Sequence, residues 1–365
     1  MKLQYAHIKN FKGVKRAELN FVPPHETEPH WLHAVLGDNG SGKTTVLQAI
    51  ALTLSLATRR TRRIEDFRWN GFIPERLSTL GKTRVEIALE FDDDEIKATQ
   101  EIYEEWQQSV RNNPSSSGRL IPPDNRKEIK LVFESGRVDC VEGEAAKFQL
   151  LGRYYVKILS RTRPDLKSYF SRLGDIFWYD QYRNLGDQPQ DAPVPESAAP
   201  VEGWSAGVEL LRETLVGWWA YHTSKAVSNG RDYIQDLERH FQKLYPGTQF
   251  EGVAPMENAR GHGAADFYFI LNRESRPFDI SEMSSGEQAI FPLICDFVRL
   301  GITKSIVMID ELEMHLHPPE QQGLLAYLPK LGPDCQFIIT THSEFVEGSI
   351  PNEQKTRLQG GRLCL

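Results

Sequence analysis

Cysteine is scarce in this chain of 365 residues, and its four cysteines lie far apart. They are Cys140, Cys295, Cys335 and Cys364, and no two of them have the short spacing that a zinc site requires. A small secreted domain held by disulfides would need a denser pattern. The cysteines therefore indicate reduced, structural thiols and exclude a disulfide framework.

Long apolar runs are also missing. The longest, AIALTLSLA at residues 49–57, is interrupted by hydroxyl groups and is too short to cross a membrane. The first residues, MKLQYAHIKNFKGVKRAELNF, alternate apolar and polar side chains as a strand does, without the apolar centre of a secretion signal. We expect a soluble, cytoplasmic protein with no membrane partner.

An excess of positive charge is absent, since 43 Lys and Arg stand against 50 Asp and Glu, for a net charge of −7. This balance excludes a uniformly basic coat for nucleic acid and leaves a local basic patch possible. The apolar share of 40% and the charged share of 25% are ordinary for a globular protein. The length is enough for one large domain or two.

The most informative stretch is GDNGSGKT at residues 37–44, which follows an apolar strand and precedes an amphipathic helix. This is the P-loop pattern in its strand–loop–helix context. Backbone N–H groups would wrap the phosphates, Lys43 would reach the β and γ oxygens, and the Thr44 hydroxyl would bind Mg²⁺. We therefore predict ATP and Mg²⁺ as cofactors, with these nucleotide ligands: Gly37, Asp38, Asn39, Gly40, Ser41, Gly42, Lys43, Thr44 and Thr45.

A second motif, KSIVMIDELEMHLHP at residues 304–318, predicts a buried strand that ends in Asp310 and Glu311. Asp310 is suited to the Mg²⁺ shell, beside Thr44. Glu311, on the opposite face, is suited to orient and deprotonate a water that attacks the γ-phosphate. The alternative is a strand that merely ends in two solvated acids, and the P-loop argues against it.

Two further stretches favour phosphate chemistry. In QFIITTHSEFV, residues 336–346, His342 follows a short strand at the sheet edge where ligands bind, although a lone histidine is often structural. There it would bond the γ-phosphate and sense its loss. In ISEMSSGEQAIF, residues 280–291, hydroxyls and a glycine precede a helix expected to begin at Glu287, a place attractive to phosphate.

The chain resembles an ABC-type ATPase head of the SMC, RecF and OLD group, because it contains four motifs in the order P-loop, SSGEQ, VMIDELEMHLHP and TTHS. The form DELEMHLHP resembles the OLD-like and RecF-like branch more than transporter subunits. The resemblance covers about residues 1–90 and 265–365. It implies an α/β fold: an ABC-type P-loop ATPase head with a mixed sheet, N-terminal antiparallel strands and a helical insert lobe.

The resemblance also implies how the motifs work together. In this family the signature of one subunit caps the ATP that the P-loop of another subunit holds, so ATP closes a homodimer or higher oligomer and hydrolysis loosens it. Glu311 and His342 would be the catalytic residues. The signature residues that would bind nucleotide in the partner's site are Ser284, Ser285, Gly286 and Glu287. Many relatives have glycine in place of Glu287, and the OLD-like branch commonly has an acid.

A glutamine that links Mg²⁺ to the helical lobe is a further family element. Gln181, in DIFWYDQYRNLG, follows an apolar strand and is the candidate third metal residue beside Thr44 and Asp310. A polar residue that simply closes the strand is the alternative.

The chain is expected to have three parts: an N-terminal lobe with the P-loop (1–93), an insert with a helical lobe (94–264), and a C-terminal lobe with the signature, the acids and His342 (265–365). Residues 84–94 and 128–136 alternate as strands, with a helix at about 94–112 between them. The proline-rich stretch 186–203 predicts an extended or disordered loop, and helices are expected in 204–245. No sustained heptads predict a coiled-coil arm.

One basic cluster follows the P-loop helix and could contact DNA phosphates: Arg59, Arg60, Arg62 and Arg63. Cations at a helix C-terminus also complement the helix dipole, which is the simpler account. A looser basic group consists of Arg153, Lys157, Arg161 and Arg163.

The motif that follows the two acids contains two histidines, His315 and His317. They are two residues apart and diverge on a helix, which argues against a shared metal.

OLD-type proteins continue into a nuclease domain, and we expect no nuclease in this chain. The leading hypothesis is therefore an ATP-hydrolysing sensor and scaffold that controls a separately encoded effector, such as a nuclease, in anti-phage defence of the Septu or retron kind. One alternative is a RecF/SMC-like DNA-repair clamp. Another is a transporter ATPase subunit, which the long segment between the P-loop and the signature and the DELEMHLHP form disfavour.

Overall fold

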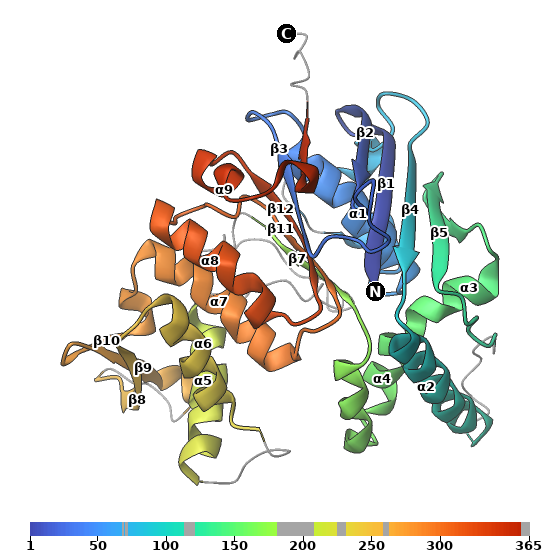
Figure 1. Cartoon of the computed structure of the whole chain (residues 1–365). Coiled ribbons are helices and arrows are strands. Elements are labelled where there is room, and N and C mark those ends of the chain that lie inside the picture. Colours follow the sequence, from blue (N-terminus) through green and yellow to red (C-terminus); the bar gives the residue numbers. More distant parts are fainter. Residues whose placement is uncertain are drawn as a thin grey trace. The chain divides into compact units, whose positions relative to one another are not determined.

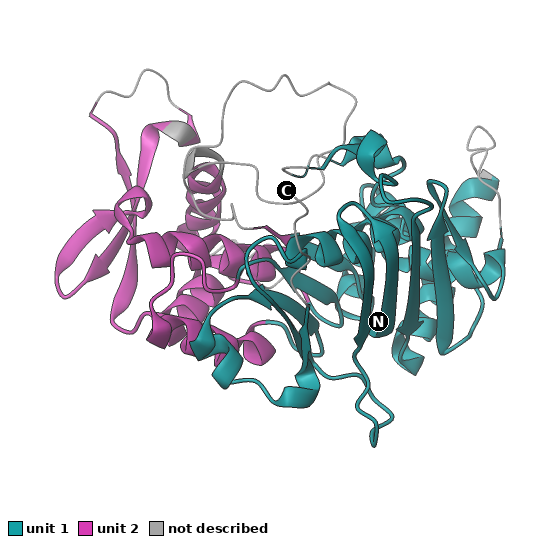
Figure 2. Ribbon diagram, turned by 90° about the horizontal axis from the view of Figure 1, so that it is seen from above, with its two compact units in different colours: residues 1–178, 303–311, 332–365 teal, residues 179–302, 312–331 magenta. Residues whose placement is uncertain are grey.

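The structure is a computed structural model that describes residues 1–67, 69, 72–112, 121–180, 208–224, 231–257 and 263–358. The chain forms two compact units (Figure 2). Unit 1 comprises residues 1–178, 303–311 and 332–365, and unit 2 comprises residues 179–302 and 312–331. These units group residues by packing, and the lobe boundaries expected at residues 93 and 264 stay a prediction.

Unit 1 contains an antiparallel sheet in the order β2-β1-β4-β5-β6 (Figure 1). Its strands are β1 (Lys2–Phe11), β2 (Val14–Asn20), β4 (Arg84–Glu90), β5 (Glu128–Glu134) and β6 (Arg137–Cys140). In β1 the buried side chains change from an odd position, Leu3, to even positions, Ala6 and Ile8, and Phe11 is buried at the end of the strand. A register shift between Leu3 and Tyr5 explains this change from odd to even positions, because one extra residue moves the following side chains to the other face.

The second sheet of unit 1 has the order β13-β3-β12-β11-β7. Its strands are β3 (Leu32–Leu36), β7 (Ile176–Tyr179), β11 (Ile306–Ile309), β12 (Gln336–Thr341) and β13 (Lys355–Arg357). The neighbours β13, β3, β12 and β11 are parallel, and every residue of β3, β11 and β12 is buried, as in a sheet covered on both faces. Their carboxyl ends share one edge, which brings the three predicted phosphate motifs of this unit together.

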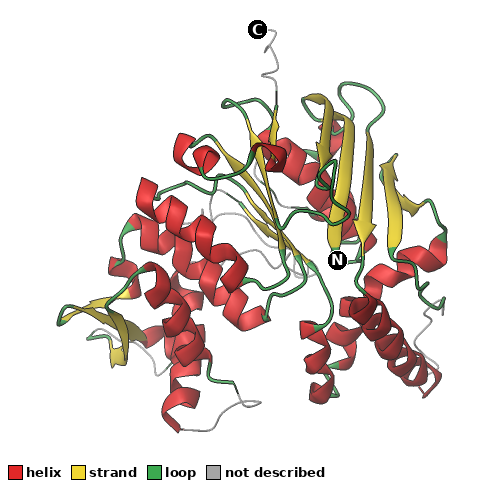
Figure 3. Ribbon diagram, viewed as in Figure 1, coloured by secondary structure: helices red, strands yellow, loops and turns green. Residues whose placement is uncertain are grey.

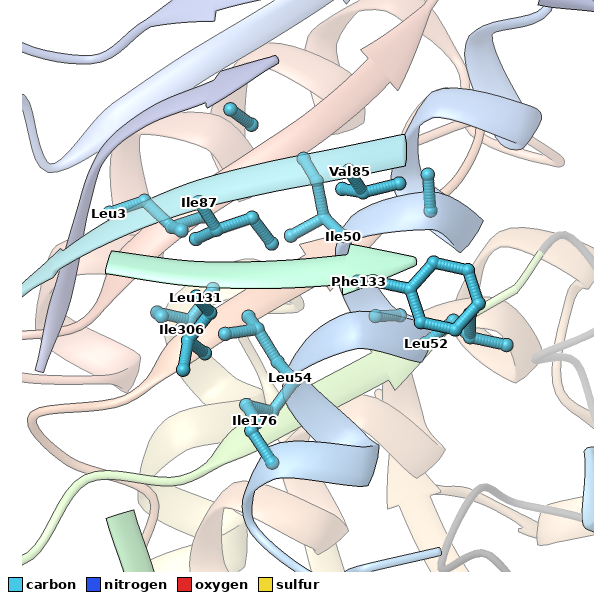
Figure 4. Packing of buried hydrophobic residues seen from close by; sticks show 14 of the residues in the cluster. Leu3, Ile50, Leu52, Leu54, Val85, Ile87, Leu131, Phe133, Ile176 and Ile306 are labelled. Atoms are coloured by element: carbon cyan, nitrogen blue, oxygen red, sulfur yellow. The ribbon is translucent and has the colours of Figure 1, made fainter. Parts of the chain in front are cut away.

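Helix α1 (Lys43–Ala57) lies in the core between these two sheets. Its residues Val46, Leu47, Ile50 and Leu54 have no exposed side-chain surface although they point in different directions around the helix. A helix that is apolar on all sides is a core helix. Figure 4 shows three of its side chains, Ile50, Leu52 and Leu54, among residues of both sheets: Val85, Ile87, Leu131, Phe133, Ile176 and Ile306.

The other helices of unit 1 contribute fewer residues to this core, among them Ile96 and Ala146. These helices are α2 (Asp93–Asn112), α3 (Glu144–Phe148), α4 (Gly152–Leu159) and α9 (Glu344–Gly348). Short 3-10 turns join the elements: Ile64–Asp66, Pro74–Arg76, Gln149–Leu151, Pro164–Ser171 and Asn352–Gln354. Helices α2 and α4 enclose a separate aromatic cluster that includes Tyr103 and Tyr155, so the unit has a second, smaller core.

Unit 2 is mainly helical (Figure 3). It contains α5 (Val208–Ser224), α6 (Tyr233–Leu244), α7 (Ser285–Leu300) and α8 (Pro318–Leu331), with 3-10 turns at Ala264–Asp266 and Ile280–Glu282. A small antiparallel sheet in the order β10-β9-β8 packs on α5 and α6. Its strands are β8 (Thr248–Pro255), β9 (Phe267–Arg273) and β10 (Arg276–Asp279).

The expected fold class is confirmed, since the chain is α/β with antiparallel and parallel sheets. The strand, helix and strand expected over 84–136 are β4, α2 and β5. Two sequence predictions, the loop at 186–203 and the role of Gln181, concern residues outside those that the structure describes. Among the residues that the structure describes, no helix is long and apolar enough to span a membrane.

Candidate nucleotide site

The P-loop connects β3 to α1, and Lys43 is the first residue of the helix. The Lys43 side chain is 5% exposed, and its Nζ donates to the carbonyl oxygens of Gly37 at 2.8 Å and Asp38 at 3.2 Å. The ammonium therefore lies inside the loop. Gly42 precedes the helix and has no side chain to cap it, so the first N–H groups of α1 remain suited to an anion.

Two positions of the loop require glycine. Gly37 has φ +152°, and a Cβ there would lie 2.5 Å from Ser41 Oγ and 3.2 Å from the Leu358 carbonyl oxygen. Gly42 has φ +97°, and its Cβ would lie 2.7 Å from a methyl group of Val14. Both the backbone conformation and the lack of space exclude a side chain.

The cradle fits a phosphate chain. The Ser41 hydroxyl oxygen is buried and has no hydrogen-bond partner among the described residues, although buried polar groups are almost always paired. It lies in the loop that Lys43 closes, beside the uncapped end of α1. A phosphate oxygen is the group that would complete these donors.

The two predicted acids follow β11, and a hydroxyl network links the first of them to the P-loop. Asp310 is 1% exposed, and its carboxylate accepts from Thr44 Oγ1 at 2.8 and 3.1 Å. Thr340 Oγ1, from β12, donates to Asp310 at 2.6 Å. The same oxygen accepts from the backbone N–H of Glu311 at 2.7 Å. Three elements of unit 1 therefore meet at this carboxylate.

Glu311 lies in the left-handed region with φ 47°, which costs about 1 kcal/mol for a residue with a side chain. The Thr340 hydroxyl holds its N–H in this position. Strained residues cluster at functional sites, where the surrounding structure fixes them. Glu311 is partly exposed, whereas Asp310 is buried, so only the second acid is accessible to a water.

His342 is exposed directly after β12, at the same sheet edge as the acids. The next residue, Ser343, caps the short helix α9 by accepting from the N–H of Val346 at 3.4 Å. The strand end and the cap fix the backbone on both sides of His342.

Thr44 and Asp310 are the residues that fit a magnesium ion, because a hydroxyl and a carboxylate from two elements converge within hydrogen-bond distance. Bound Mg²⁺ would neutralise phosphate charge at this point. Within the described part of the chain no group of three or more His, Cys, Asp and Glu side chains is arranged to hold a metal. The third predicted metal residue, Gln181, lies outside the described residues.

The signature residues belong to unit 2, at the start of α7. The helix begins at Ser285, two residues earlier than expected, because Ser284 is its N-cap. Ser284 Oγ accepts from the N–H of Glu287 at 3.3 Å and donates to its carboxylate at 2.7 Å. Ser285 is exposed, and Gly286 is buried against α8, where a Cβ would lie 2.9 Å from Glu320 Oε2.

Glu287 was predicted to bind nucleotide, and its side chain is 4% exposed. Its carboxylate accepts from the N–H of Ser284 at 2.9 Å and pairs with the guanidinium of Arg273. This carboxylate is therefore engaged within its own chain.

Two stretches of the chain match family models, and neither stretch includes the middle of the chain. Residues 6–138 match a family described as "AAA domain". Residues 225–346 match one described as "AAA domain, putative AbiEii toxin, Type IV TA system". The first match contains the P-loop and the second contains the signature and the two acids.

The chain is also similar to three curated proteins over most of its length. It is 20% identical to the Retron Vc95 probable ATPase of Vibrio cholerae serotype O1 biovar El Tor, over 97% of this chain and 73% of that protein. It is 23% identical to the Septu protein PtuA of Bacillus mycoides (strain KBAB4), over 98% and 40%. It is 23% identical to the OLD nuclease of Thermus scotoductus (strain ATCC 700910 / SA-01), over 93% and 59%.

Among solved structures, the chain resembles one described as the SmcHead bound to the C-winged helix domain of ScpA. The TM-score is 0.51 at 17% identity, over 95% of this chain and 91% of that one, which is a likeness of fold. In its family matches, its relatives and its fold, the chain matches an SMC/RecF/OLD-type ATPase head. The head carries its P-loop, both acids and His342 in unit 1 and its signature in unit 2.

Two residues of the head near the P-loop have positions that sequence patterns did not reveal. Thr340 links Asp310 to the backbone of Glu311, and its only sequence signal is its place two residues before His342. Lys12, in the turn between β1 and β2, donates to Gln48 of α1 at 2.9 Å. Burial lowers the pKa of the Lys12 ammonium. No motif surrounds Lys12, so only the fold places this cation beside the P-loop helix.

The basic cluster predicted to contact DNA is partly engaged within the head. The Arg59 guanidinium lies 5.2 Å from the ring centre of Phe148, and Arg60 forms an ion pair with Asp175 at 3.7 Å. The cluster also includes Arg62 and Arg63, which are exposed. In the looser group, Arg153 pairs with Asp175 and Arg163 pairs with Glu105 and Asp165.

Proposed function

We propose that this head binds ATP with Mg²⁺ and hydrolyses it to ADP and phosphate while two copies are closed around the nucleotide. The observation that carries the proposal is the network of Thr44, Asp310, Thr340 and Glu311 at the mouth of the P-loop. It aligns a metal-binding pair with the accessible, strained carboxylate of Glu311, which directly follows Asp310 at the end of β11. This is the arrangement that phosphoryl transfer to water requires.

The residues of the site have different roles in this reaction. The loop N–H groups, the uncapped end of α1 and Lys43 bind the phosphates. Thr44 and Asp310 hold Mg²⁺. Glu311 orients the attacking water and accepts its proton. His342 bonds the γ-phosphate and responds when the phosphate leaves.

The signature completes the site from a second copy of the chain. Ser285 is exposed at the start of α7, where the helix dipole favours an anion. The resemblance to SMC heads supports a shared site, in which Ser285 and Gly286 cap the ATP on the partner's P-loop. ATP binding would then shift the population toward the closed pair, and hydrolysis would release it.

The closed and open pairs would control a separately encoded effector, such as a nuclease, in anti-phage defence. The similarity to a retron ATPase and to a Septu protein supports this context. The chain spans 40% of the Septu relative, so the activity of that whole protein is not transferred.

Two variants test the hydrolysis. Lys43→Ala should abolish ATP binding, because it removes the cation that lies in the cradle. Glu311→Gln should retain ATP binding and lose turnover. Nucleotide binding and phosphate release are measured for both proteins. Normal turnover by Glu311→Gln would mean that Glu311 is not the base.

A mixture tests the shared site. Ser285→Arg should bind ATP and fail to hydrolyse it, because the larger side chain blocks the partner's phosphates. Mixed with Lys43→Ala protein, it should regain activity, since the P-loop of one chain and the signature of the other form one intact site. A mixture that stays inactive would contradict the shared site.

A second candidate function is a DNA clamp, which the SMC-like fold and the exposed Arg62 and Arg63 favour. Duplex DNA should then stimulate hydrolysis, and Arg62→Ala/Arg63→Ala should remove the stimulation. An ATPase rate indifferent to DNA excludes the clamp.

The effector hypothesis has a separate test. Glu311→Gln protein purified from its host with Mg-ATP should carry a polypeptide whose nuclease activity changes on ATP removal.

A further inference from the structure

The acidic residue of the signature, Glu287, is buried and paired within unit 2, whereas Ser285 is exposed. Glu287 is buried, and Ser284 contacts its carboxylate through both its N–H and its hydroxyl, at 2.9 and 2.7 Å. The Ser284 hydroxyl in turn accepts a hydrogen bond from the backbone N–H of Glu287. This reciprocal capping box fixes the first turn of α7, which contains Ser285 and Gly286.

The other partner of the Glu287 carboxylate comes from the small sheet of unit 2. Arg273, the last residue of β9, pairs with Glu287 through Nη2. Its Nε and Nη2 also donate to Thr248 Oγ1, at 2.9 and 2.7 Å. Thr248 is fully buried at the start of β8 and lies opposite Arg273 in the sheet. Strands β8 and β9 and helix α7 are thus tied together at the base of the signature.

The position of Arg273 is fixed by an unusual turn. Glu274 and Ser275, which connect β9 to β10, both have positive φ, at 52° and 63°. Such a two-residue turn joins neighbouring strands tightly but normally contains Asn or Gly. The guanidinium lies against the rings of Tyr245 and Phe278, at 5.9 and 5.6 Å from their centres. Arg273 is therefore held on several sides.

We propose that Glu287 and Arg273 are positioning residues that hold Ser285 and Gly286 in register for the ATP bound by a partner copy, and that Glu287 does not itself bind nucleotide. A carboxylate at the γ-phosphate would repel it, whereas a buried carboxylate paired with Arg273 fixes the turn without adding charge at the surface. The proposal rests on the shared site described under the proposed function.

The test uses Glu287→Ala and Arg273→Gln in the full chain, with melting temperature, ATP affinity and turnover measured for each. Both variants should bind ATP on their own P-loops with unchanged affinity. Their kcat should fall about tenfold, since misplacement of a group by a fraction of an ångström costs catalysis more than binding. The double variant should lose no more than either single variant, because both changes break one link. Glu287→Gln keeps the hydrogen bonds to Ser284 and should recover part of the rate.

Mixing separates a positioning role from general stability. Glu287→Ala protein mixed with Lys43→Ala protein should regain the activity of the Ser285→Arg/Lys43→Ala mixture, since the intact signature then comes from the Lys43→Ala chain. A defect in folding or in the variant's own nucleotide site would not recover.

The outcomes are distinct. Recovery with Ser285→Arg but not with Glu287→Ala or Arg273→Gln would overturn this proposal and leave the shared site standing. Wild-type kcat in both single variants would also overturn it. Failure of the Ser285→Arg mixture itself would refute the shared site. If Glu287→Ala does not fold, Arg273→Gln decides, because that side chain is 35% exposed.

Discussion

Thr340 connects the two acids of the site through one hydroxyl. It is fully buried, donates to Asp310 and accepts from the Glu311 N–H, so both bonds form without competition from water. Its loss would remove one donor to the buried carboxylate of Asp310 and the acceptor of the Glu311 N–H at once. A residue that touches no substrate would then control the geometry of the reaction.

Thr340→Val should keep the fold and the ATP affinity and lower kcat about tenfold, because the acids lose their alignment. Thr53→Val is the matched control, since the buried Thr53 hydroxyl donates to the Ala49 carbonyl within α1. The control should lose about 1 kcal/mol of unfolding free energy and keep its kcat. Equal kcat values for the two variants would refute the role of Thr340.

His33 supplies a pH dependence at the residue scale. It lies in β3, 1% exposed, with Nε2 2.8 Å from Thr356 Oγ1 of β13. Burial, and to a smaller extent the charge of His30, lowers its pKa from 6.5 to about 4. The folded protein therefore keeps this imidazole neutral while the unfolded chain binds a proton below pH 6.5.

The unfolding free energy should fall as the pH is lowered from 6.5 to 4, and His33 should contribute about 3 kcal/mol of that fall. His33→Gln keeps a polar group for Thr356 and cannot titrate. Urea unfolding at pH 7, 5 and 4 measures the difference between the two proteins. If both lose the same free energy over this interval, His33 is not the neutral histidine described.

At this scale the sequence reveals residues that lie in one continuous motif. Lys43 and Thr44, and likewise Asp310 and Glu311, are adjacent in the chain, so spacing alone indicates them. Thr340 acts on a residue 29 positions away, and no local pattern contains that pairing. The pairing of the Glu287 carboxylate with Arg273 could not be predicted for the same reason, since Arg273 lies on another element.

Among elements, buried strands and the P-loop helix could be predicted because their apolar patterns are strong. The sheet β8-β9-β10 was not predicted, since its strands alternate weakly and its Glu274–Ser275 turn lacks the usual Asn or Gly. Helix α7 begins at Ser285 rather than Glu287, because the Ser284–Glu287 capping box draws the first turn into the helix.

At the scale of elements, the backbone conformation of the P-loop should determine the affinity for ATP. Gly37→Ala should weaken ATP binding at least tenfold, because its Cβ would meet Ser41 Oγ at 2.5 Å and distort the cradle. Gly217→Ala, in the exposed middle of α5 with open space around it, is the control. The control should keep its ATP affinity and gain roughly 0.5–1 kcal/mol of stability. Calorimetric titration with ATP decides between an altered and an intact loop.

At the scale of the whole molecule, the two halves of the proposed site belong to different compact units of the chain. The cradle, the acids and His342 belong to unit 1, and Ser285 and Gly286 belong to unit 2. Sequence motifs identify both halves but give no distance between them. The resemblance carried by the sequence motifs supplies the hypothesis that the halves meet across two copies, with ATP between them.

The native mass of Glu311→Gln protein, with and without Mg-ATP, tests this hypothesis most directly. The variant should bind ATP without consuming it, so the closed pair should accumulate. We predict twice the 41.7 kDa of one chain with Mg-ATP, the mass of one chain without it, and one ATP per chain in the larger species. A protein that binds ATP in full and keeps the mass of a single chain would contradict the account.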